Sequence, residues 1–306
     1  MIDSADLKSL VDQAMKDPAL SHMRPVVEKE LLHYDLLYVL EKEGMLESLV
    51  FQGGTALRLC YGGSRFSEDL DFAGGTDFTS LTMVDMKTCI EDYLGSRYGL
   101  EVFVKEPSSL KNEAQYAELR IEKWQIRIVT SPERRDIPKQ KIKLEIANIP
   151  AHTTAIRPLI RNYDFLPDGY EDLLLVVETE NEIMADKLIS LPATLSHVRN
   201  RDIWDLAWLS QRGASVDSDL VKKKMADYQL TEYPDRLDRM LLRLPDIIQG
   251  KAFHQEMERF LPAETFERTL GQPKFKPYLL DRVTSLLETV QGDLGRCRPE
   301  KTDFEM

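Results

Sequence analysis

The sequence has few cysteines, no long hydrophobic run and no excess of positive charge. Its three cysteines, Cys60, Cys89 and Cys297, are widely separated and form no C-x-x-C pair, which argues against a disulfide framework and a zinc site. No stretch contains eighteen consecutive apolar residues, and the first residues are charged and amphipathic, unlike a signal peptide. We therefore expect a cytoplasmic protein that is neither secreted nor membrane-spanning.

The charge balance excludes an overall basic coat for nucleic acid. The 306 residues include 40 basic and 52 acidic side chains, a formal net charge of −12. A local basic groove for RNA stays compatible with that balance. Basic side chains that form a candidate RNA track, or simply face solvent, are Arg134, Arg135, Lys139, Lys141 and the run Lys222–Lys224.

The order of apolar patterns predicts two lobes. Residues 26–43 have apolar side chains at helical spacing, and short runs rich in Val and Ile between 100 and 160 predict a sheet. From about Tyr170 onward helical spacing dominates. We expect an α/β (α+β) fold with a mixed-sheet catalytic lobe and flanking helices in 1–165. A helical lobe in 166–306 completes the chain, and 161–171 form the connection.

Two aspartates with a single residue between them carry the strongest chemical signal. On a strand, Asp69 and Asp71 point to the same face because side chains alternate. Adjacent carboxylates repel, and shared divalent cations relieve that repulsion. Such a pair suits phosphoryl or nucleotidyl transfer with two metals about 3.5–4 Å apart. A chance pair on a solvated strand is the alternative.

Upstream, a glycine pair lies where a strand is expected to turn into a helix. Gly53 and Gly54 allow the backbone to approach phosphate oxygens, and the free N–H groups of the helix start attract anions. Thr55 and Ser67 add hydroxyl groups, and Arg65 adds a positive charge. Alone, the glycines indicate only a turn; together with Asp69 and Asp71 they indicate a nucleoside triphosphate site.

These residues resemble a known family. GGTALRL followed by RFSEDLDF is similar to the first motif of the nucleotidyltransferases with the DNA polymerase beta fold, and specifically to AbiEii-type toxins, which include the MenT toxins. Thirteen residues separate Thr55 from Asp69, which is at the long end of the superfamily's spacer. The resemblance runs from about residue 26 to 209, and it implies a nucleotidyltransferase-type mixed sheet.

A third carboxylate is expected on a later strand. Glu145 shares the polar face of QKIKLEIANI with Lys143, and it resembles the family residue that completes the metal site or activates the acceptor hydroxyl. The alternatives are an exposed glutamate paired with Lys143, or Glu118 or Glu122 as the true third ligand.

Two helical motifs in the second half extend the resemblance. Lys187 lies in the middle of an apolar helical stripe, and ADKL is similar to the family's Ala-Glu-Lys motif with Asp186 in place of Glu. RDIWDL matches the family's Arg-Asp-x-x-Asp motif, which implies a functional Asp202 and a supporting Asp205. The structural alternatives are a solvent-directed lysine, and an Asp202 helix cap beside an Asp205–Arg201 pair.

The resemblance implies a toxin that moves a nucleoside monophosphate from an NTP to a hydroxyl, most simply the 3′ end of tRNA. Asp69, Asp71 and Glu145 would hold Mg²⁺ or Mn²⁺, with Glu145 also assisting deprotonation. The glycine segment, Arg65, Ser67 and Lys187 would bind the triphosphate, and Asp202 would orient nucleotide or acceptor. It also implies a repressor-type or kinase-type antitoxin. The alternatives are an antibiotic or protein acceptor, or a non-catalytic binding module.

Overall fold

The structure is a computed structural model that describes residues 6–107, 121–134, 136, 138–167, 169–194 and 197–295. Its contacts divide the described chain into two compact units. The sheet unit comprises the residues up to Thr179 together with Met257–Thr269. The helical unit comprises Glu180–Glu256 together with the residues from Leu270 onward.

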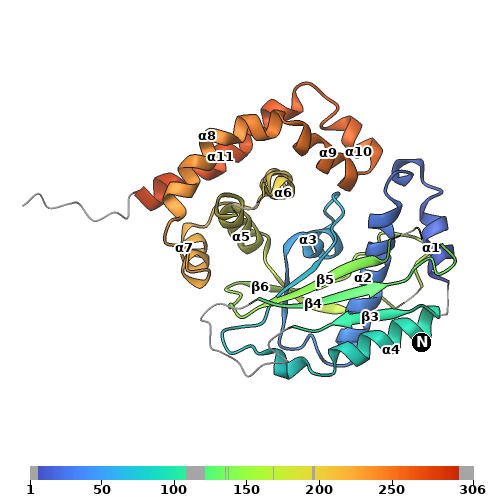
Figure 1. The fold of residues 1–306 in the computed structure, drawn as a ribbon. Coiled ribbons are helices and arrows are strands. Elements are labelled where there is room, and N and C mark those ends of the chain that lie inside the picture. Colours follow the sequence, from blue (N-terminus) through green and yellow to red (C-terminus); the bar gives the residue numbers. More distant parts are fainter. Residues whose placement is uncertain are drawn as a thin grey trace, which may run out of the picture. The chain divides into compact units, whose positions relative to one another are not determined.

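Among the described residues, seven strands form one mixed sheet in the order β3-β4-β5-β2-β1-β7-β6. Figure 1 labels four of these strands, β3, β4, β5 and β6. Strand β2 is parallel to β5, and β1 is parallel to β7, whereas the other neighbouring pairs are antiparallel. The strands are β1 (Val50–Gln52), β2 (Leu70–Ala73), β3 (Val102–Lys105), β4 (Ile121–Ile128), β5 (Gln140–Ala147), β6 (Thr154–Pro158) and β7 (Leu174–Glu178).

The sheet has one buried face and one open face over β4 and β5. Trp124 and Ile126 on β4 and Leu144 on β5 are fully buried, whereas the alternate residues Lys123 and Lys143 are exposed. This alternation follows from the two-residue period of a strand. The polar face that the sequence predicts for β5 is therefore the open face of the sheet.

Helices cover parts of the sheet unit. Helix α2 contacts α1, α4 and β5, while α4 contacts β3, and α3 contacts β1 and β2. The helical elements of this unit are α1 (Leu7–Ala14), η1 (Pro18–Leu20), α2 (Arg24–Lys42), α3 (Gly53–Tyr61), η2 (Ser80–Met83), α4 (Met86–Tyr98) and α10 (Ala263–Arg268). Helix α9 (Lys251–Phe260) begins in the helical unit, and its last four residues belong to the sheet unit.

The helical unit packs around α5, which contacts α6, α7 and α8, while α11 contacts α6, α7 and α8. Its core contains Leu188, Leu206, Leu237 and Val283, all 1% exposed or less. None of the helices in the described ranges has the length and apolar character needed to cross a bilayer. The helices are α5 (Glu180–Ala193), α6 (Asn200–Gln211), α7 (Ser218–Asp227), α8 (Tyr233–Gln249) and α11 (Phe275–Gly295).

The α/β fold class predicted from the sequence is confirmed by the mixed sheet and its helices. Strand β7 was not predicted, because the short apolar run 173–177 lies where helical spacing begins to dominate. The expected boundary at 165/166 assigns β7 to the helical lobe, whereas in the structure β7 pairs with β1 and β6. The segment Met257–Thr269 also belongs to the sheet unit.

Candidate active site

The start of α3 lies against three side chains nominated from the sequence. Strand β1 leads directly into α3 at Gly53, whose φ of +77° favours glycine. A Cβ atom at Gly53 would lie 2.9 Å from Asp71 Oδ2, and one at Gly54 would lie 2.5 Å from Arg65 Nη2 and 3.0 Å from Ser67 Oγ. The two glycines therefore let a carboxylate, a guanidinium and a hydroxyl approach the helix N-terminus.

Asp71 and Glu145 are neighbours across the parallel strands β2 and β5. Their Cα atoms are register partners, so the two side chains leave the same face of strands that run about 4.8 Å apart. Glu145 accepts a hydrogen bond from Lys123 Nζ at 3.0 Å. The Glu145–Lys143 pair considered from the sequence is thus replaced by a cross-strand pair with β4.

Asp69 immediately precedes β2 and contacts β5. Its Oδ1 accepts a hydrogen bond from the backbone N–H of Lys143 at 3.2 Å, and Lys143 Nζ lies 3.5 Å from Oδ2. Asp69 and Asp71 therefore both face β5 residues, at the positions of Lys143 and Glu145 respectively. The structure brings all three nominated carboxylates to the same pair of strands.

The donor set suits a divalent cation. Asp69, Asp71 and Glu145 offer carboxylate oxygens, which are the ligands that Mg²⁺ and Mn²⁺ prefer. In the part of the chain that the structure describes, no three His, Cys, Asp or Glu side chains converge closely enough to hold a metal ion. Instead, Lys143 and Lys123 provide the positive charge beside Asp69 and Glu145.

The alternative third ligands are placed differently. Glu122 is buried on β4 and pairs in register with Ile146, so it belongs to the face opposite Glu145. Glu118 lies outside the described residues. Of the two, Glu122 is on the wrong face to join Asp71.

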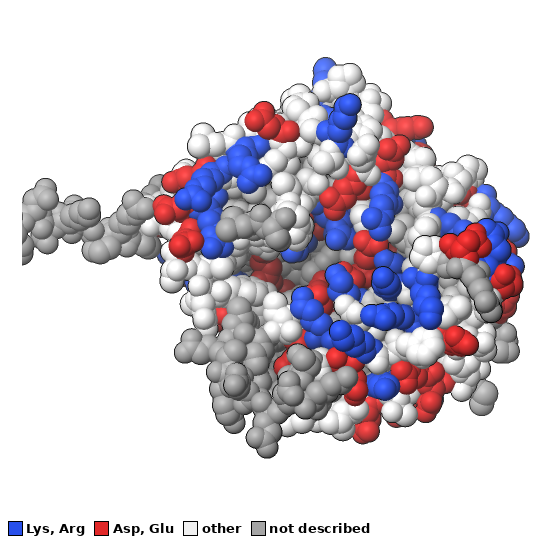
Figure 2. All heavy atoms as spheres, viewed as in Figure 1, with Lys and Arg blue, Asp and Glu red and all other residues white. Residues whose placement is uncertain are grey.

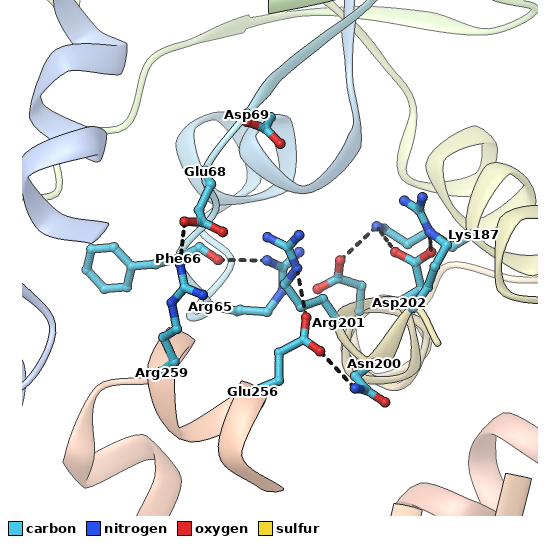
Figure 3. A network of polar contacts seen from close by, with 12 residues as sticks. Arg65, Phe66, Glu68, Asp69, Lys187, Asn200, Arg201, Asp202, Glu256 and Arg259 are labelled. Carbon is cyan, nitrogen blue, oxygen red and sulfur yellow. Dashed lines mark hydrogen bonds and ion pairs between the residues drawn. The ribbon is translucent and has the colours of Figure 1, made fainter. Parts of the chain in front are cut away.

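The segment that carries Asp69 is held by several elements. The hydroxyl of buried Thr55 donates to the backbone carbonyl of Asp69, so the side chain of this nominated residue fixes the aspartate backbone. Glu68 Oε1 lies 2.6 Å from Lys29 Nζ on α2. It also lies 2.7 Å from Arg259 Nη2 on α9 (Figure 3). The Phe66 N–H donates to the carbonyl of Phe260 at 2.9 Å.

His33 on α2 supports the same segment. Its Nε2 lies 3.1 Å from the carbonyl oxygen of Glu68. Burial lowers the pKa of His33 to about 4, so the imidazole is neutral at physiological pH and donates its single N–H to that carbonyl. Neither His33 nor Arg259 was nominated from the sequence, because nothing in the local pattern links them to residues 66–69.

Lys187 and Asp202 form a second cluster, within the helical unit. Lys187 Nζ lies 3.0 Å from Asp202 Oδ1 and 2.7 Å from Asp205 Oδ2 (Figure 3). Ser190 Oγ donates to Asp202 at 2.7 Å, and Arg199 Nε also donates to Asp202. Burial tends to raise the pKa of Asp202, but the charges of Lys187 and Arg199 outweigh it and hold this pKa below its usual range.

These contacts differ from the structural alternatives drawn from the sequence. Lys187 is 5% exposed and paired rather than directed to solvent. Asp202 is the third residue of α6, whose cap position is Arg199. Arg201 pairs with Glu256 at 3.4 Å.

Asp186 lies on a different side of α5 from Lys187. Its Oδ2 is 3.2 Å from Nζ of the fully buried Lys224 on α7, which also contacts Glu182 at 2.8 Å. Asp186 therefore takes part in α5–α7 packing. The position at which ADKL differs from the family's Ala-Glu-Lys motif is therefore a packing residue. Its neighbour Lys187 is the lysine that pairs with Asp202.

Two solved structures are similar to this chain over most of its length. A crystal structure of a protein from H. pylori proposed to be a nucleotidyltransferase matches 92% of this chain and 99% of its own, with 18% identity and a TM-score of 0.44. JHP933 from Helicobacter pylori matches 92% of this chain and 94% of its own, with 18% identity and a TM-score of 0.43. No curated protein shows significant similarity to the sequence.

A comparison with protein families matches residues 35–279 to the family described as "Nucleotidyl transferase AbiEii toxin, Type IV TA system". The match includes the glycine pair and the three nominated carboxylates, and it extends through Lys187 and Asp202. It covers most of the 306 residues. The chain therefore belongs to the AbiEii nucleotidyltransferase toxins of type IV toxin–antitoxin systems.

Proposed function

We propose that this toxin transfers a nucleoside monophosphate from an NTP to the 3′-terminal hydroxyl of a tRNA in the cytoplasm. The observation that carries the proposal is the register of Asp71 with Glu145, next to the glycine start of α3. The carboxylates suit the metal ion of a metal–nucleotide substrate, and the adjacent helix N-terminus attracts its phosphates.

Groups around the start of α3 bind the triphosphate. The backbone N–H groups at Gly53, Gly54 and Thr55 attract phosphate oxygens. Arg65 lies next to Gly54 and neutralises negative charge, while the Ser67 hydroxyl donates a hydrogen bond. Lys187 contributes a further positive charge, and Asp202 orients the nucleotide or the acceptor.

In the transfer, the acceptor oxygen attacks the α-phosphorus, the bond to the bridging oxygen of the β-phosphate breaks, and pyrophosphate leaves. Asp69, Asp71 and Glu145 are the residues that would hold Mg²⁺ or Mn²⁺. When bound, the cation supplies charge neutralisation for the triphosphate and the leaving group. Glu145 assists by accepting the proton of the attacking hydroxyl.

The test is incubation of the purified chain with total tRNA, Mg²⁺ and each labelled NTP in turn. We expect label in tRNA with the wild type and with the control Asp172→Asn, whose residue is exposed on the sheet unit. We expect none with Asp71→Asn. Label that enters only a small molecule or a protein would contradict the tRNA acceptor, and equal labelling by Asp71→Asn would contradict the site.

The antitoxin that the family implies is proposed to act as a transcriptional repressor or as a kinase. Intact-mass measurement of the toxin after coexpression with its genomic neighbour distinguishes the two. A phosphate adduct supports the kinase, and unmodified toxin with reduced transcript supports the repressor. Unmodified toxin together with an unchanged transcript level would contradict both antitoxin mechanisms.

A further inference from the structure

Basic side chains gather on the open face of the strands β3, β4 and β5. The exposed residues on this face include Lys105, Lys123, Arg127, Lys141 and Lys143, and Figure 2 shows Lys and Arg side chains clustered over β4 and β5. The chain as a whole carries a net charge of −12. A concentration of cations on an acidic protein marks a surface that attracts anions.

Among the described residues, the cations at the two ends of this face have different neighbours. Lys143 and Lys123 pair with Asp69 and Glu145. Arg127 and Lys141 are instead register partners on antiparallel strands. Like charges directly opposite each other destabilise a sheet. A bound anion would relieve that repulsion.

An aromatic side chain lies beside the two cations. Phe103 on β3 is the register partner of Arg127 and is 47% exposed. Lys139 Nζ lies 4.7 Å from the centre of its ring. Together with Pro138 and Lys141, these side chains line an open hollow of about 540 Å³, within the size range of small-ligand clefts, roughly 300–1,000 Å³.

An exposed ring among cations fits a nucleotide of a single strand. Bases stack on aromatic rings, and lysine and arginine bind the phosphates on either side. An acidic peptide would use the positive charges but would not need an exposed phenylalanine. Because Lys141 and Glu145 are four residues apart on β5, the hollow lies about 13 Å along the strand from the carboxylates.

We propose that the hollow formed by Phe103, Arg127, Lys139 and Lys141 binds the acceptor RNA a few nucleotides from its reacting end. Phe103 stacks on a base, and Arg127 and Lys141 contact phosphates. The strand then runs along β5 toward Asp69, Asp71 and Glu145. This inference rests on the proposed function in one respect, namely that the acceptor is a nucleic acid.

Binding of RNA without NTP or metal tests the surface separately from catalysis. Anisotropy of a fluorescent single-stranded oligoribonucleotide is measured over a series of salt concentrations. For Arg127→Gln combined with Lys141→Gln, we expect at least tenfold weaker binding. We also expect a salt slope reduced by about 1.4, which is ~0.7 for each lost phosphate contact. For Phe103→Leu, we expect about tenfold weaker binding with an unchanged slope.

The matched control is Lys16→Gln combined with Lys274→Gln, which removes two exposed cations elsewhere and should bind like the wild type. If the variants of the hollow bind RNA as tightly as the wild type does, the proposed RNA-binding surface is wrong. In that case, labelling of tRNA by the wild type would still support the proposed function. The proposed surface is also wrong if the wild type itself binds no RNA. Equal competition by a poly-glutamate peptide, with no effect of Phe103→Leu, would assign the hollow to an acidic protein segment instead.

Discussion

Asp71 and Glu145 face each other across the parallel strands β2 and β5, although 73 residues separate them in the sequence. Local patterns nominated each residue separately. Only the strand order places them side by side, with Asp71 also touching the first residue of α3.

Replacing Asp71 tests the carboxylate pair. Asp71→Asn keeps the shape of the side chain and removes its charge, so we expect the fold to persist and the transfer rate to fall by roughly a thousandfold, about 4 kcal/mol of barrier. Single-turnover transfer at saturating Mn²⁺ and NTP measures the loss. A rate within tenfold of the Asp172→Asn control would contradict a role in catalysis.

The two glycines of α3 are expected to differ when replaced by alanine. At Gly54 the added Cβ would displace the Arg65 guanidinium, the movable end of a long side chain, so Gly54→Ala should raise KM for the NTP with little loss of stability. Gly53→Ala also strains a backbone with φ of +77° and should lower the unfolding free energy by about 1 kcal/mol or more. Steady-state kinetics and denaturant unfolding of both variants measure the contrast. The same KM as wild type in Gly54→Ala would argue against Arg65 in nucleotide binding.

Lys187 combines a structural and a proposed functional role. Lys187→Met removes the cation from between two buried carboxylates and should destabilise the protein by about 3 kcal/mol. Adding Asp205→Asn reduces the uncompensated charge while Arg199 still pairs with Asp202, so stability should largely return. We expect transfer activity to stay low in this double variant and to remain high in Asp205→Asn alone. Recovery of activity together with stability would make Lys187 purely structural.

His33 predicts a loss of stability in mild acid. The unfolded chain protonates this histidine below about pH 6.5, whereas the folded chain, with a pKa of about 4, does not. The folded state therefore loses stability as the pH falls from 6.5 to 4, by up to roughly 3 kcal/mol. In His33→Gln, which keeps an N–H donor, this part of the pH dependence should disappear. Unfolding midpoints of both proteins across this window, with His197→Gln as an exposed control, measure it; parallel pH profiles would contradict the prediction.

The sequence predicts the elements that have strong local signals. The helix expected over 26–43 is α2, and the strand expected at Asp69 and Asp71 is β2, which begins at Leu70. The expected turn from a strand into a helix at the glycine pair is also found, because β1 leads into α3 at Gly53. Apolar periodicity and paired glycines identify such elements because both are properties of neighbouring residues.

Other parts of the site depend on contacts that no local pattern encodes. The pairing of Glu145 with Lys123 rather than Lys143 follows from the β4–β5 register. Arg259 meets Glu68 from 191 positions away in the chain. Such partners can be found only when the strand order is known and when it is known that the end of α9 packs in the sheet unit.

The contribution of α9 means that the sheet unit of this toxin is not one continuous stretch of sequence. A fragment ending at Thr179 would contain all the strands of the sheet but lack Arg259 and Phe260, two of the anchors for residues 66–68. Expressed alone, it would present Asp69 directly after a loosened segment 66–68. A minimal active version would need residues 257–269 supplied through a linker or as a separate peptide.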